Sequence, residues 1–65
     1  MSLHADLASM QSTLDQVLDR LTEASGEVRG TDQDDLLGDI YEIERHLKAA
    51  SRRLRRAVAG LPDPT

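Results

Sequence analysis

The side chains with the most obvious chemical potential are the arginines of the run Arg52-Arg53-Leu54-Arg55-Arg56. On a helix with Leu54 facing inward, five cations share an outward stripe: Arg45, Lys48, Arg52, Arg55 and Arg56. Such a stripe suits phosphates or an acidic protein surface, and it is also typical of a solvated face that complements the helix dipole. The net charge of −4 disfavours binding to nucleic acid, whose backbone is also negative. The single aromatic residue disfavours it as well, because bases commonly stack on aromatic side chains.

The two histidines, His4 and His46, raise the question of a metal site. Glu42 and His46 are four residues apart, whereas the di-iron motif of helical bundles needs Glu and His three apart, with matching ligands on other helices. We therefore expect no metal and no cofactor. The chain has no Cys and no Gly-rich phosphate loop, so we also expect no enzymatic activity and no small-molecule substrate.

Length and composition limit the elements that could position these groups. The chain has 65 residues, 7.2 kDa, with no Cys, Trp or Phe, so it forms one small domain without disulfides or cysteine-bound zinc. It contains no apolar run of the roughly 18 residues that span a bilayer and no signal-peptide pattern at the start. We expect a cytoplasmic protein that does not bind membranes. Its Arg-rich, Lys-poor composition is typical of a GC-rich bacterial genome.

Apolar residues recur in alternating steps of four and three from Leu3 to Val28 and again from Leu36 to Leu61. This period of 3.5 residues is the coiled-coil pattern. We letter the heptad a to g, with Leu14 and Leu54 at a positions and the other apolar residues of the repeat at a or d. The pattern predicts one all-α domain over 1–65, with helices at about 3–28 and 33–60, a turn at about 29–32 and a tail at 61–65.

The connector contains Gly30, which suits the position just past a helix end because glycine adopts positive φ without strain. Thr31 or Asp32 is then the expected N-cap of the second helix, with Asp34 or Asp35 completing a capping box. A connector this short makes the helices antiparallel neighbours. The sequence therefore predicts an antiparallel two-helix hairpin.

If the two helices pack through their a and d positions, each a or d residue of one helix faces one of the other helix when the two residue numbers sum to 64. We call this contact the a/d seam. In this register Leu14 faces Ala50, and Leu7 faces Ala57. The apolar residues at e positions widen each stripe, which is the pattern of helices in a bundle. We therefore predict that two hairpins dimerise into a four-helix bundle. The expected interface residues are Leu14, Leu18, Leu37, Tyr41, Ala50, Leu54, Ala57 and Val58.

Tyr41 lies outside the predicted seam, one turn after Leu37, and the two are expected to form a small exposed apolar patch. A tyrosine beside a leucine is a typical interface anchor. The pattern as a whole indicates an interaction or assembly module that self-associates, as a homodimer, or docks on a helical partner protein. The alternative is a small nucleic-acid-binding regulator that uses the basic stripe.

Overall fold

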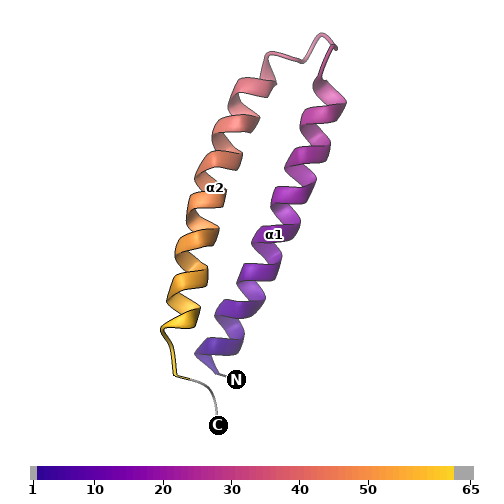
Figure 1. The fold of residues 1–65 in the computed structure, drawn as a ribbon. Helices are drawn as coiled ribbons and strands as arrows, with labels where there is room; N and C mark the ends of the chain where they lie inside the picture. Colours follow the sequence, from indigo (N-terminus) through magenta and orange to yellow (C-terminus); the bar gives the residue numbers. More distant parts are fainter. Residues whose placement is uncertain (1, 63–65) are drawn as a thin grey trace.

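The computed structural model describes residues 2–62, which form two helices, α1 (Leu3–Val28) and α2 (Leu36–Ala59). The helices lie side by side and run in opposite directions, so that the start of α1 and the end of α2 are at the same end of the molecule (Figure 1). The hairpin measures 53 × 17 × 11 Å. The all-α, two-helix hairpin predicted from the sequence is confirmed.

Helix α1 is capped at its start by Ser2, whose hydroxyl accepts a hydrogen bond from the Ala5 amide at 3.0 Å. This satisfies one of the backbone donors that a helix N-terminus leaves unpaired. At the other end, the Arg29 amide donates to the Ser25 carbonyl, and Gly30 follows with a φ of 77°. The prediction that Gly30 takes positive φ just past the helix is confirmed.

The start of α2 differs from the prediction. The helix begins at Leu36 after Asp35, whose side chain makes no capping hydrogen bond, and neither Thr31 nor Asp32 is the N-cap. The Thr31 hydroxyl instead donates to the Val28 carbonyl at 2.7 Å and accepts from the Gln33 amide at 3.1 Å. Residues 32–35 then form turns, in which the Asp34 amide donates to the Thr31 carbonyl and the Leu36 amide to the Gln33 carbonyl.

The seam between the helices consists of a and e positions, not a and d positions. In both helices, no residue at an a or e position is exposed, whereas seven of the eight d positions are. Two e-position serines are the most buried residues of the described chain, Ser51 at 4% and Ser25 at 6% exposure. The prediction that Leu14 faces Ala50 and Leu7 faces Ala57 is therefore wrong, since both alanines are exposed. The residue numbers of two hydrogen-bonded pairs across the helices nevertheless sum to 62 and 66, close to the predicted 64.

Polar side chains explain why the helices meet along a and e. The Gln11 amide nitrogen donates to the Ser51 hydroxyl at 2.7 Å, which places these two e positions opposite each other. The Thr22 hydroxyl lies 3.2 Å from the Glu44 carboxylate across the seam and 3.2 Å from the Leu18 carbonyl of its own helix, so these two acceptors share its single proton. Small serines at e positions allow close approach of the helices, and Ser51 supplies a hydrogen-bond partner for the Gln11 amide nitrogen, which the seam partly buries.

The hairpin has little core of its own. Ile40 is the one buried apolar residue among residues 2–62, and the remaining a positions are half-buried. Domains normally consist of at least two packed layers of secondary structure, whereas this hairpin is a single layer of two helices. Within the described residues, neither helix combines the length and apolar character needed to cross a membrane.

Candidate interaction surfaces

The exposed d positions form the principal candidate site. Five large apolar side chains at these positions are between 36% and 61% exposed: Leu3, Met10, Val17, Leu36 and Ile43. The smaller Ala50 and Ala57 continue the same heptad position along α2 and are also exposed. We call these seven residues the apolar face.

Helix geometry places the d residues of both helices on the same side of the hairpin. At 100° per residue, d positions lie about 80° to one side of the centre of the a/e seam, and b positions lie about 80° to the other side. Because the helices are antiparallel (Figure 1), this offset points to the same side for α1 and α2. The apolar face is therefore continuous across both helices.

The exposed area of the chain agrees with an incomplete core. The hairpin exposes 4999 Å², whereas the scaling of surface with mass gives about 4100 Å² for a compact monomer of this size. The excess agrees with the elongated shape of the hairpin, 53 × 17 × 11 Å, which has no second layer to cover one side of the helices.

The opposite side of the hairpin is polar and is already bridged between the helices. Arg29, at the end of α1, donates from Nη2 to the Tyr41 hydroxyl of α2 at 2.7 Å. The hydrogen bond between Thr22 and Glu44 lies on the same side, since Thr22, Arg29 and Tyr41 are all at b positions. This side therefore differs in chemistry from the apolar face.

The predicted interface residues are divided between three locations. The leucines and the valine lie half-buried between α1 and α2, where they form the hairpin's own seam: Leu14, Leu18, Leu37, Leu54 and Val58. Ala50 and Ala57 lie on the apolar face. Tyr41 is exposed on the polar side and bonded to Arg29. Of the predicted patch of Tyr41 with Leu37, Tyr41 is exposed and Leu37 is half-buried.

The basic stripe remains on the surface. Arg52, Arg55 and Arg56 line a shallow open depression with Ala59, and Arg45 and Lys48 are also exposed. A second depression brings Asp15 of α1 near Lys48, Arg52 and Arg55. Within residues 2–62, no ion pair links the two helices, since the ion pairs present both lie within α2.

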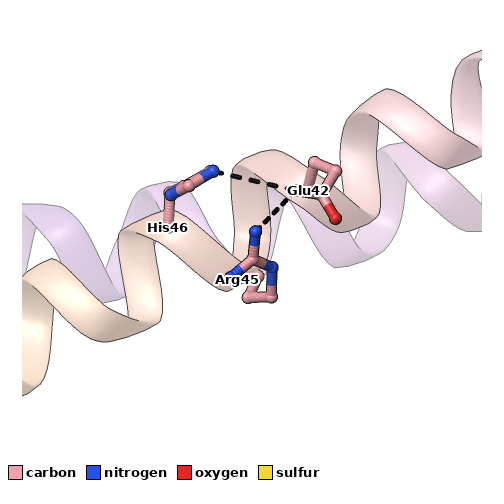
Figure 2. A network of polar contacts seen from close by, with 3 residues as sticks. All are labelled: Glu42, Arg45 and His46. Carbon is pink, nitrogen blue, oxygen red and sulfur yellow. Dashed lines mark hydrogen bonds and ion pairs between the residues drawn. The ribbon is translucent and has the colours of Figure 1, made fainter.

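Both contacts involve Glu42, which pairs with Arg45 and also lies near His46 (Figure 2). Arg45 Nη2 lies 2.8 Å from Glu42 Oε2, and His46 Nε2 lies 3.7 Å from the same oxygen. The hydrogen bond from Arg45, together with its positive charge, lowers the pKa of Glu42, and Glu42 in turn raises the pKa of Arg45. In the part of the chain that the structure describes, no three His, Cys, Asp or Glu side chains cluster as metal ligands would.

Sequence reasoning missed the exposure of Leu3, Met10, Val17, Leu36 and Ile43, which it assigned to the seam. The signal that could have found it lies at the e positions, where Gln11, Ser25 and Ser51 interrupt the apolar residues. Polar residues that can bond across a seam compete with apolar residues for the position facing the neighbouring helix. Comparison with protein-family models, with curated proteins and with solved structures finds no match to this chain.

Proposed function

We propose that this protein is a non-enzymatic assembly module that associates through its apolar face. The observation that carries the proposal is the exposure of the apolar d residues of both helices on one side of a single-layer hairpin. Monomeric proteins rarely leave a contiguous apolar surface of this kind uncovered. Association gives the hairpin the second layer that its own residues cannot provide.

The apolar residues at d, outside the a/e seam, support a bundle as the form of the assembly, although five of the eight e positions are polar. A helix in a four-helix bundle contacts two neighbours, so it needs a stripe wider than a two-stranded seam. Here the e positions contact the other helix of the hairpin, and the d positions are available for a second pair of helices. The a positions, such as Leu14 and Ile40, lie between these two directions and would become fully buried.

Sedimentation velocity tests the proposal with two variants that carry the same added charge. The first places lysines on the apolar face, Met10→Lys with Ile43→Lys. The matched control places lysines at exposed positions outside it, Ser12→Lys with Ala49→Lys. We expect the wild type and the control to associate at micromolar concentration, and the apolar-face variant to sediment as a 7.2 kDa monomer.

The variants also separate association from folding. Both lysines of the first variant replace residues that are exposed in the hairpin, so circular dichroism should still detect helix in it. A wild-type chain that stays a folded monomer at every concentration would contradict the proposal. Equal association of the two variants would show that the apolar face is not the interface.

The basic stripe supports a second candidate function, binding of RNA or DNA. Arg52, Arg55 and Arg56 present exposed guanidinium groups around one depression, and guanidinium groups bind phosphate oxygens well. A fluorescence titration with a short oligonucleotide at two salt concentrations tests this function. Binding that weakens steeply with salt and is lost in Arg52→Glu with Arg56→Glu would support it, and no binding at low salt would exclude it.

A further inference from the structure

The charges of the hairpin are separated along its length. The half next to the turn, residues 16–46, carries nine acidic and three basic residues, a net charge of −6. The other half of the sequence, residues 2–15 and 47–65, carries three acidic and five basic residues, a net charge of +2. The molecule therefore has an acidic turn end and a basic open end.

From this separation we infer that the partner on the apolar face is a second copy of this chain, turned so that the two turns lie at opposite ends of the assembly. The inference rests on the proposed function, and it adds the identity and the direction of the partner. In this arrangement the acidic half of each copy lies over the basic half of the other. In the reverse arrangement, with both turns at one end, each half would face a half of the same charge.

A second copy matches the apolar face in length and in charge at the same time. A two-fold axis perpendicular to the helices pairs identical surfaces, as most homodimers do, and it repeats the same favourable charge contact at both ends. The partner's apolar face has the same length as the surface that it must cover. A single helix from another protein would cover only one of the two helices that contribute to the apolar face.

The distances in a bundle allow these charges to interact. Neighbouring helix axes are about 8–10 Å apart, and the screening length is about 8 Å at physiological ionic strength. Lys48 and Arg55 are at b positions, on the side away from the apolar face, so the charges that interact across the contact are those at g and c. In the half at the open end these are Asp6, Arg53 and Arg56, with a net charge of +1, and in the half next to the turn they are Arg20, Glu23, Glu27, Asp39 and Glu42, with a net charge of −3. The preference for opposed turns should be strongest at low salt, whereas burial of the apolar face persists in high salt.

Distance measurement between spin labels tests the direction of packing. The chain has no cysteine, so Gln33→Cys gives one label in the turn, and Ala59→Cys gives one near the open end; both residues are exposed. Each helix is about 36–39 Å long. Labels at the same site on two copies should therefore be about 40 Å apart for either variant. In a mixture of the two variants, the turn label of one copy should lie within about 20 Å of the open-end label of the other.

The outcomes separate the inference from the proposed function. Same-site distances of about 40 Å in both variants, with the short distance in the mixture, support the opposed arrangement. Same-site distances of about 20 Å in both variants would overturn it while leaving self-association intact. The absence of any dipolar signal, with a monomeric mass in sedimentation, would overturn both proposals.

Discussion

The hydrogen bond between Gln11 and Ser51 offers the sharpest test of how the two helices meet. Ser51 is 4% exposed, and its hydroxyl accepts from the Gln11 amide nitrogen at 2.7 Å. The Gln11 amide oxygen is buried, with no hydrogen-bond partner in the described part of the chain. Ser51→Ala removes the hydroxyl acceptor and leaves the Gln11 amide nitrogen only the Ser51 backbone carbonyl, at 3.4 Å, so we expect a loss of about 1–2 kcal/mol in the free energy of unfolding.

Replacing both partners should restore most of that loss. Gln11→Met removes the buried amide together with its unpaired oxygen, and exchanging both polar partners for apolar groups is often close to neutral. We therefore expect Gln11→Met with Ser51→Ala to unfold near the wild-type urea concentration. The double-mutant cycle should then give a coupling energy of about 1–2 kcal/mol, which is large beside the roughly 3–5 kcal/mol that a core of this size supplies.

Urea unfolding followed by circular dichroism at one fixed chain concentration measures all four proteins of the cycle. The control cycle pairs Ser51→Ala with Gln16→Met, because Gln16 is exposed and its effect should add to that of Ser51 within about 0.5 kcal/mol. A Gln11–Ser51 coupling no larger than the control coupling would refute the a/e seam, since an a/d seam leaves both residues on its flank.

Three other predictions follow from the same geometry. Ser51→Leu should lower the free energy of unfolding by about 2–5 kcal/mol, because it removes a hydrogen bond and overpacks the seam. Ala50→Leu should leave the helix content in dilute solution unchanged. A larger loss of stability in urea for Ala50→Leu than for Ser51→Leu would favour the a/d seam. Gly30→Ala should cost about 1–2 kcal/mol in the same assay, because φ is 77° there and L-residues are strained at positive φ; an unchanged midpoint would show that the turn has another conformation. Arg45→Ala should raise the pKa of Glu42 toward its ordinary value of 4.5, as measured by carboxyl NMR titration. Because the pKa of Glu42 is lowered in the folded protein, the stabilisation from this pair is present above pH 4.5 and is lost as the pH falls through the folded pKa. If Arg45→Ala left the titration of Glu42 unchanged, the pairing with Arg45 would be disproved.

The sequence predicts the hairpin well because its strongest signals are local. The 3.5-residue repeat, the short connector and Gly30 each depend on neighbouring residues, and the structure has two antiparallel helices with positive φ at Gly30. Thr31 shows the limit of local reasoning, since its hydroxyl fits the start of α2 or the end of α1 equally well. The structure assigns it to α1 through the Val28 carbonyl.

The candidate site was harder to predict because it depends on the rotation of each helix. A stripe that is three positions wide allows either the d or the e positions to face the neighbouring helix. The choice depends on which polar groups find partners across the seam, as Gln11 does with Ser51 and Thr22 with Glu44. This competition involves residues more than twenty positions apart, so the repeat alone does not reveal it.

The chain's two isoleucines allow the most direct test of the account, because one lies in the seam and the other on the apolar face. Ile40 is buried, whereas Ile43 is 46% exposed in the single hairpin. Methyl NMR with a soluble paramagnetic agent reports the solvent exposure of each side chain separately. In Met10→Lys, which should weaken association, we expect Ile43 to be strongly broadened and Ile40 to be protected. In the concentrated wild type both should be protected. Broadening of Ile43 at every wild-type concentration would contradict the claim that a partner covers the apolar face.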